Sequence, residues 1–165
     1  MSESQTIIHP IPPLFDKNSR ILILGSFPSV KSREAMFFYG HPQNRFWKLL
    51  SLLFGELAPQ SVDEKKSLAL NHRIAIWDTI RSCTIVGSAD SSIRDAVPND
   101  LTEILDNSMV EHIFCNGATS YNLYMKYIYP TLGIDALKLP STSPANAAFT
   151  MDRLVQAWKV IKEYV

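Results

Sequence analysis

The sequence has little of what marks several large classes of protein. It has two cysteines in 165 residues, too few for a disulfide framework or for the four thiolates of an iron–sulfur cluster. No apolar run approaches the roughly 18 residues of a membrane-spanning helix. The first ten residues, MSESQTIIHP, lack the basic start and long apolar stretch of a signal peptide. We therefore expect a reduced protein of the cytoplasm, or of the nucleus in a eukaryote, with no membrane partner.

Net charge is also missing, because 16 Lys and Arg residues balance 16 Asp and Glu residues. With no global attraction to nucleic acid, any such partner has to be held by a local surface. The histidines, at positions 9, 41, 72 and 112, do not cluster with carboxylates at metal-ligand spacing. Glycine-rich dinucleotide and phosphate-loop motifs are absent. We therefore expect no metal and no organic cofactor.

The length and composition instead fit one globular domain over residues 1–165. Apolar residues make up 46% of the chain and charged residues 19%, which excludes a disordered protein. Residues 1–19 are polar and carry prolines. We interpret them as an N-terminal arm that crosses the surface before the core begins.

Short apolar segments alternate with helical patterns along the rest of the chain. The segments 20–24, 74–77, 112–115 and 134–139 predict strands, and the first three are apolar enough to be covered on both faces, as in a parallel sheet. Helices are predicted at 45–54, after the capping box Ser61–Glu64, after Asn99 or Asp100, after Gly117, and from residue 151 to the end. This alternation is typical of an α/β layer fold, in which ligands bind beyond the carboxyl ends of the strands.

Four loops should therefore meet at one site. The first begins with Gly25-Ser26-Phe27-Pro28-Ser29 and continues through Phe37 to Asn44. The second starts at Asp78 and the third at Asn116. The fourth, residues 139–146, is rich in hydroxyl groups and pinned by two prolines.

These loops make the chain resemble the uracil-DNA glycosylase superfamily, and most of all its hypoxanthine-DNA (deoxyinosine) glycosylase branch. The resemblance covers residues 20–150 and rests on GSFPS after the first strand, YGHPQNRFW, IWD, FCNG and LPSTSPAN, in that order. GHPQNRFW is the most specific of these motifs. The chain departs from many members of the superfamily at Ser26 and Phe27, where they carry Asp or Asn. It departs from relatives with uracil activity at Leu139, where these often carry His.

The resemblance implies a three-layer α/β/α sandwich with a four-stranded, mainly parallel central sheet. It also implies a monofunctional, monomeric DNA-deoxyinosine glycosylase, which hydrolyses the N-glycosidic bond of deaminated bases in DNA, hypoxanthine first, and leaves an abasic site. The expected partner is DNA containing deaminated bases. Since the target base must leave the duplex, we expect stacking residues and a loop that reaches the minor groove.

By this resemblance we assign roles to three sets of residues. The catalytic set is Asn44, which would position the attacking water, with Asp78 and Asn116. The base-binding set is Gly25, Ser26, Phe27, Phe38, Tyr39 and His41. The DNA-binding set is Ser141, Thr142, Ser143, Pro144 and Asn146.

Each assignment has a structural alternative. Asn44 can equally cap the helix that follows it, and capping can coexist with the catalytic role. Asp78 can cap the next turn, and Asn116 can be a strand-end turn residue. Phe38 and Tyr39 can be core residues, and His41 can brace its loop. Lys31, Arg33, Arg45 and Lys48 either contact phosphate or are ordinary solvated charges.

Other residues and functions are less favoured. A Cys115–His112 nucleophile is disfavoured, because residues three apart on a strand face opposite sides, so Cys115 is taken as a buried structural thiol. The alternative within the class is a uracil or mismatched-thymine glycosylase. Outside it, the alternatives are a non-catalytic module that binds damaged or single-stranded DNA and, less favoured without a phosphate loop, a nucleotide-binding protein.

Overall fold

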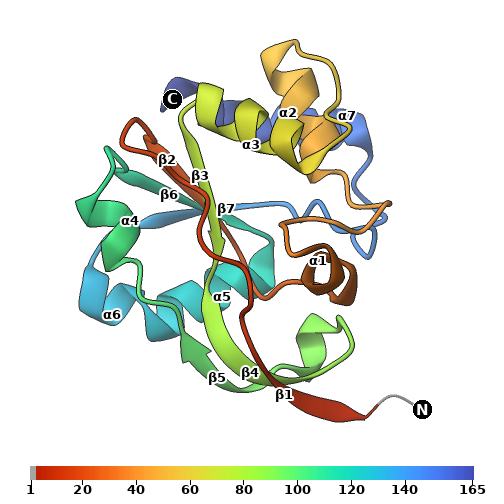
Figure 1. The fold of residues 1–165 in the computed structure, drawn as a ribbon, viewed down its shortest axis with the longest axis vertical. Helices are drawn as coiled ribbons and strands as arrows, with labels where there is room; N and C mark the ends of the chain where they lie inside the picture. The colour runs from red at the N-terminus through yellow and green to blue at the C-terminus, as the bar shows by residue number, and fades with distance from the viewer. Residues whose placement is uncertain (1–2) are drawn as a thin grey trace.

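The computed structural model describes residues 3–165 and is built around a parallel sheet of four strands (Figure 1). The strand order is β3-β2-β6-β7, and every neighbouring pair is parallel. The strands are β2 (Ile21–Gly25), β3 (Ile74–Asp78), β6 (His112–Asn116) and β7 (Ala136–Leu139). All four lie where the sequence predicts them, with ends shifted by one or two residues.

Helices cover both faces of this sheet, which confirms the α/β/α sandwich. Side chains alternate along a strand, so Ile21 and Ile23 of β2 face one layer and Leu22 and Leu24 face the other. The first layer holds the helices α2, α3 and α7, and the second holds α4, α5 and α6 (Figure 1). Their bounds are α2 (Phe46–Phe54), α3 (Val62–Asn71), α4 (Thr102–Asp106), α5 (Ala118–Tyr127), α6 (Tyr129–Leu132) and α7 (Met151–Trp158), which a 3-10 turn (Lys159–Glu163) follows.

Local chemistry fixes where these helices begin. The Ser61 hydroxyl accepts from the Glu64 N–H at 3.1 Å, which is one half of the predicted capping box. The Glu64 carboxylate accepts from the N–H of Gln60, one residue before the cap, and not from that of Ser61. Ahead of α4, the Asp100 carboxylate accepts from the Thr102 N–H at 2.9 Å. Asn99 has another function: its buried amide donates to the carbonyl oxygens of Asp78 and Ile80.

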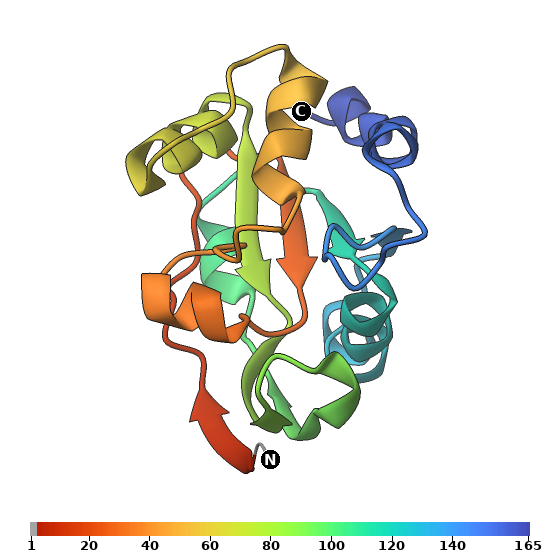
Figure 2. The ribbon, with the colours of Figure 1, turned by 90° about the vertical axis from the view of Figure 1, so that its right-hand side faces the viewer.

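A second sheet was not predicted. β1 (Ser4–Ile8), β4 (Ile80–Val86) and β5 (Arg94–Pro98) form an antiparallel sheet in the order β1-β4-β5. β4 starts two residues after β3 ends, so the chain passes from the parallel sheet into this one with Thr79 between them. Figure 2 shows β2 and β3 running side by side toward this second sheet and toward α1 (Val30–Ala35).

The N-terminal segment is more than an arm that crosses the surface before the core begins. Residues 1 and 2 lie outside the described part of the chain. From Ser4 onward the segment forms β1, and Ile11 and Leu14 are buried in the same core as α2 and α7. Leu14 also exchanges backbone hydrogen bonds with Ile76 of β3. The prediction missed this because a five-residue edge strand has no apolar run of its own. No helix within residues 3–165 is both long and apolar enough to span a bilayer.

Candidate active site

A cleft of about 630 Å³ lies beyond the carboxyl ends of the parallel strands. The last residues of β2, β3 and β6, which are Gly25, Asp78 and Asn116, all line it. The convergence of the four loops is therefore confirmed. The cleft is also lined by predicted residues from the first and last loops, namely Ser26, Phe27, Phe38, Tyr39, His41, Asn44, Ser141, Thr142, Ser143 and Pro144. Asn146 lies instead in an adjoining pocket of about 570 Å³, which shares Ser141 and Ser143 with the cleft.

Gly25 forms the floor of this cleft because nothing larger fits there. A Cβ at this position would overlap Asp78 Oδ1 and lie 3.2 Å from the Tyr39 hydroxyl. The bare backbone of Gly25 therefore brings a carboxylate oxygen and a phenolic hydroxyl to one small region. This close approach, and no special backbone angle, explains the glycine.

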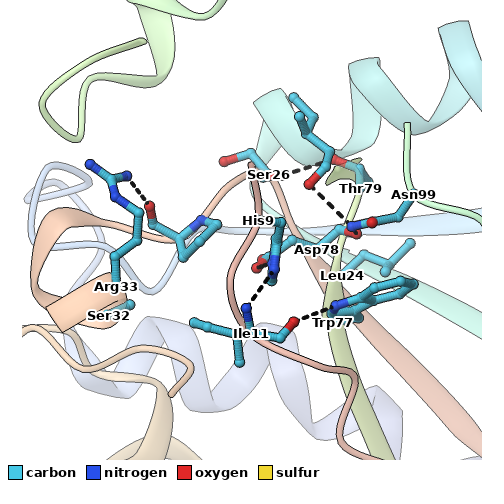
Figure 3. A network of polar contacts seen from close by, with 12 residues as sticks. His9, Ile11, Leu24, Ser26, Ser32, Arg33, Trp77, Asp78, Thr79 and Asn99 are labelled. Carbon is cyan, nitrogen blue, oxygen red and sulfur yellow. Dashed lines mark hydrogen bonds and ion pairs between the residues drawn. The ribbon is translucent and has the colours of Figure 1, made fainter. Parts of the chain in front are cut away.

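The Asp78 carboxylate is 5% exposed and is held by a histidine from the N-terminal segment (Figure 3). His9 Nε2 lies 2.7 Å from Asp78 Oδ2. Asp78 does not cap the next turn, because the N–H groups of Thr79 and Ile80 donate to the carbonyl oxygens of Gly25 and Ser26. The sequence gives no sign of this contact, because His9 lies 69 residues from its partner and no local spacing signals it.

Tyr39 contributes a buried hydroxyl that has no hydrogen-bond partner among residues 3–165. Its backbone is left-handed, with a φ of 53°, and its ring lies against Phe46 with a centroid separation of 4.1 Å. Burial, with the nearby Asp78 charge, raises the pKa of Tyr39 well above its ordinary value, so the hydroxyl stays protonated. A protonated, unpaired and buried hydroxyl is a donor available to a ligand.

Asn44, Thr142 and Asn116 form one connected chain of hydrogen bonds. Asn116 Nδ2 donates to Thr142 Oγ1 at 3.0 Å, and Thr142 Oγ1 donates to Asn44 Oδ1 at 2.9 Å. Thr142 N–H also donates back to Asn116 Oδ1 at 3.0 Å. Asn116 is thus bound to the last loop and is not a simple turn residue. Thr142, expected on the DNA surface, is fully buried and binds the two amides instead.

Asn44 has the capping role that the sequence allowed, and its catalytic role stays a prediction. Its Oδ1 accepts from the Phe46 N–H at 3.0 Å, which caps α2, as well as from Thr142. An amide oxygen accepts two hydrogen bonds, so Oδ1 is filled and the group left for a ligand is the Nδ2 end of the amide, which donates. Asn44 is half-buried and lines the cleft. It can hold an oxygen atom there by donating to it.

Arg45 fastens the last loop to the start of α2. Its guanidinium donates to the carbonyl oxygens of Ser143 at 2.9 Å, Asn146 at 3.1 Å and Phe149, and its Nε to that of Thr142 at 3.4 Å. Arg33 similarly donates to the Pro28 and Gly87 carbonyls. Two of the four cations around the first motif therefore stabilise loops. Lys31 is exposed beside Glu34.

All three tryptophans of the chain anchor a segment that builds the site. The indole N–H of Trp47 donates to the Phe38 carbonyl at 3.0 Å, that of Trp77 to the Ile11 carbonyl at 3.0 Å, and that of Trp158 to the Pro140 carbonyl at 2.9 Å. The first loop, the N-terminal segment and the last loop are each tied in this way to an element of the core. Three segments that build the site are therefore each fixed to the core by an indole hydrogen bond.

The remaining predicted residues occupy the walls. Phe27 and Phe38 line the cleft but are only 7% and 2% exposed, so most of each ring is core. His41 braces its loop, because its Nδ1 accepts from the Gln43 N–H at 3.1 Å. The Ser26 hydroxyl donates to Asp90 at 2.8 Å, a contact that no motif in the sequence signals.

Two titratable groups near the site have shifted pKa values. Burial raises the pKa of Asp90, the Ser26 hydroxyl opposes the rise, and the Asp78 charge adds to it. Burial also raises the pKa of Cys115 to about 12. With its thiol protonated and His112 exposed against Tyr164, Cys115 fits the structural role expected for it. Within residues 3–165, no three His, Cys, Asp or Glu side chains gather in a way that could hold a metal ion.

Comparisons with known proteins point to one family. The model of the uracil DNA glycosylase superfamily matches residues 12–162. A protein of Methanosarcina acetivorans named hypoxanthine DNA glycosylase is 34% identical over 143 residues, which cover 86% of this chain and 90% of the relative. One of the same name from Methanosarcina barkeri is 33% identical over 138 residues, covering 82% and 85%. The solution NMR structure of a candidate uracil DNA glycosylase from M. acetivorans superposes with a TM-score of 0.79 at 31% identity, covering 94% of this chain and 97% of that one.

Proposed function

Because the chain belongs to the uracil DNA glycosylase superfamily, we propose that it is a monofunctional DNA glycosylase that releases hypoxanthine from DNA. Water adds to C1′ of the deoxyribose while the bond from C1′ to N9 of the base breaks. The electron pair of that bond leaves with the base, which takes up a proton, and an abasic site remains. The names of the two archaeal relatives support hypoxanthine as the substrate.

The observation that carries this proposal is that a hydrogen-bond acceptor and a hydrogen-bond donor lie close together beside Gly25, which has no side chain to separate them. Asp78 Oδ1 accepts and the Tyr39 hydroxyl donates, and both border the same point above Gly25. Deamination converts an amidine edge into a lactam edge, with an N–H beside a carbonyl. Hypoxanthine presents such an edge at N1–H and O6, whereas adenine presents the donor and the acceptor in the opposite places.

The leaving base also benefits from this pairing. As the glycosidic bond breaks, negative charge spreads onto the base, including its carbonyl oxygen. A fixed hydroxyl donor at that oxygen stabilises the charge without having to reorient, which is how preorganised dipoles lower a barrier. Asp78, an acceptor, holds the neighbouring N–H and so fixes the orientation of the ring.

Asn44 then positions the attacking water. With Oδ1 filled by Phe46 and Thr142, the Nδ2 amide group can hold a water molecule by donating to its oxygen. A neutral amide adds no negative charge beside DNA phosphates. In this role Asn44 contributes position and takes no proton, and most of the rate gain comes from alignment.

A second substrate is favoured by the same observation. Uracil also carries a lactam edge, at N3–H and O4, so the pair at Gly25 suits it too. We expect uracil to be released more slowly than hypoxanthine, since Ser26 and Phe27 depart from many members of the superfamily and Leu139 departs from relatives with uracil activity.

Quaternary state and location complete the proposal. We expect the protein to act as a monomer. The two cysteines are free and buried, which suits the reducing conditions of the cytoplasm. Both statements stay predictions.

The experiment is base release from 5′-labelled oligonucleotides that each carry one deoxyinosine, deoxyuridine or G·T mismatch. Single-turnover reactions are scored by alkali-labile strand cleavage, and the free base is identified by mass spectrometry. We expect release from deoxyinosine first and no strand cleavage before alkali. Tight binding of deoxyinosine DNA without any free base would overturn the proposal in favour of a binding module, and release of uracil or thymine alone would replace the substrate.

A further inference from the structure

The N-terminal segment places a histidine against the base of the cleft, ahead of the region that the family model covers. That region begins at residue 12, and His9 lies before it. The backbone of His9 continues the pairing of β1, since its N–H donates to the Arg81 carbonyl at 2.6 Å. Its side chain is 2% exposed and points to the end of β3, where Asp78 stands (Figure 3).

The hydrogen bonds of His9 fix its tautomer. The Ile11 N–H donates to Nδ1 at 3.1 Å, so Nδ1 carries a lone pair and the ring proton is on Nε2. Nε2 then donates to Asp78 Oδ2 at 2.7 Å. A doubly protonated ring would lose the bond from Ile11. The arrangement is therefore that of a neutral imidazole that donates to a carboxylate, which is a charge-assisted hydrogen bond.

The surroundings of His9 hold this geometry in place. Its ring lies 5.9 Å from Phe27, 6.4 Å from Phe38 and 6.0 Å from Trp77, measured between centroids. Ile11, which sets the tautomer, is itself fixed because its carbonyl accepts from Trp77 Nε1 at 3.0 Å. The imidazole thus has little freedom to turn away from Asp78.

The bond from His9 determines which oxygen of the Asp78 carboxylate faces the cleft. With Oδ2 occupied by His9, Oδ1 faces Gly25 and the side of the cleft where the Tyr39 hydroxyl lies. The charged groups around this point are Asp78 and, farther along the cleft, Asp90, whose oxygen is bound by Ser26. In the described chain, His9 is the side chain that donates to Asp78.

We infer that His9 is a positioning residue of the active site, which orients the Asp78 carboxylate so that Oδ1 can accept the N–H of the lactam edge. This inference rests on the proposed function, since it gives His9 its effect through base recognition. The N-terminal segment is then part of the active site and not an accessory to the domain.

The test compares variants that move or remove the donor. His9→Gln places an amide nitrogen near the position of Nε2, His9→Asn places it near Nδ1, out of reach of Asp78, and His9→Leu has no donor. We expect single-turnover release of hypoxanthine to fall about 10- to 100-fold in His9→Asn and His9→Leu, the range for losing a hydrogen bond to a charged group, and to recover to within about fivefold in His9→Gln. Equal losses in Gln and Asn would overturn the inference.

A double-mutant cycle shows whether His9 acts through Asp78. In an Asp78→Asn protein, a second change His9→Leu should slow release by less than about twofold, because the group it positions has already been altered. Losses that multiply would mean that His9 supports the fold independently and would overturn the inference. If His9→Leu does not fold, His9→Asn replaces it in the cycle, and melting temperatures identify such a case.

A measurement without catalysis separates this inference from the proposed function. The ¹⁵N signals of histidine distinguish a ring protonated at Nε2 from one protonated at Nδ1. We expect the His9 signals, which the His9→Gln variant assigns by their loss, to show the Nε2–H form in the wild-type protein. A proton on Nδ1 would overturn the inference even if hypoxanthine is released. Absence of any base release with the Nε2–H form would instead overturn the proposed function, and of the inference only the His9–Asp78 contact would remain.

Discussion

The hydroxyl of Thr142 donates to Asn44 Oδ1 across 2.9 Å, and this bond joins two loops that are 98 residues apart in the chain. Thr142 accepts from Asn116 at the same time, so one buried hydroxyl holds both amides. The orientation of the Asn44 amide is therefore set by the last loop as well as by the helix it caps. Movement of that loop and movement of Asn44 are coupled.

The first prediction concerns this coupling. Thr142→Val keeps the shape of the side chain and removes the hydroxyl, which leaves acceptor and donor groups of the two amides unpaired. We expect a loss of about 1–3 kcal/mol in the free energy of unfolding and a fall of about tenfold in base release. Chemical denaturation and single-turnover kinetics measure the two effects. Thr142→Ser, which keeps the hydroxyl, is the control and should behave like wild type within about threefold.

Asn44 allows its two roles to be separated. Asn44→Ala should lose both the cap of α2 and base release, the latter by at least about 100-fold. Asn44→Asp keeps an oxygen for the Phe46 N–H and the Thr142 hydroxyl but replaces the Nδ2 donor. We expect it to keep the wild-type melting temperature within a few degrees and still to lose release about 100-fold. An active Asn44→Asp protein would mean that this residue accepts a proton from water instead of donating to it.

The Arg45 clamp on the last loop should matter most for duplex DNA. Arg45→Lys keeps the charge but cannot reach several carbonyl groups at once, because lysine has a single ammonium group. We expect faster amide hydrogen exchange in residues 142–149. Release from duplex deoxyinosine should fall about tenfold, and release from the single strand should fall less, because only the duplex requires unpairing of the base. An equal loss on both substrates would assign the clamp to chemistry or folding.

Asp90 makes stability depend on pH. Its pKa is raised above the ordinary value of 3.8, chiefly by burial. A carboxyl group with a higher pKa in the folded state favours folding most when it is protonated, so its contribution is full below about pH 3.8 and is lost as pH rises through the folded pKa. Asp90→Asn, which keeps an oxygen for Ser26, should therefore gain stability relative to wild type between about pH 4 and pH 7. Denaturation midpoints across this range test the sign.

The sequence alone was enough for the parallel sheet because each strand signals itself locally. Segments such as RILIL and HIFC are short and almost entirely apolar, which predicts buried strands. The polar residues that follow these segments mark the positions of the loops at the ends of the strands. Gly25, Asp78 and Asn116 could be placed in one cleft on that basis, and the family resemblance supplied Asn44 and the last loop.

The antiparallel sheet and the His9 contact could not be found in this way. β1 and β5 are mostly exposed edge strands of five residues, with too little alternation to separate them from loops. His9 reaches Asp78 only because β1 pairs with β4, and pairing between distant segments leaves no periodic signal. The burial of Thr142 could not be predicted for another reason: a hydroxyl in a polar loop gives no sign that it will be buried.

The three tryptophans also give the site an intrinsic fluorescence signal. Each indole N–H is bound to a different segment around the cleft, through Phe38, Ile11 and Pro140. Indole emission shifts when the partner of the N–H changes, and replacing two tryptophans by phenylalanine would leave one reporter for one segment. The protein therefore carries one fluorophore against each of these three segments. Any ordering of a segment when DNA binds would change the emission of its tryptophan, without an attached dye.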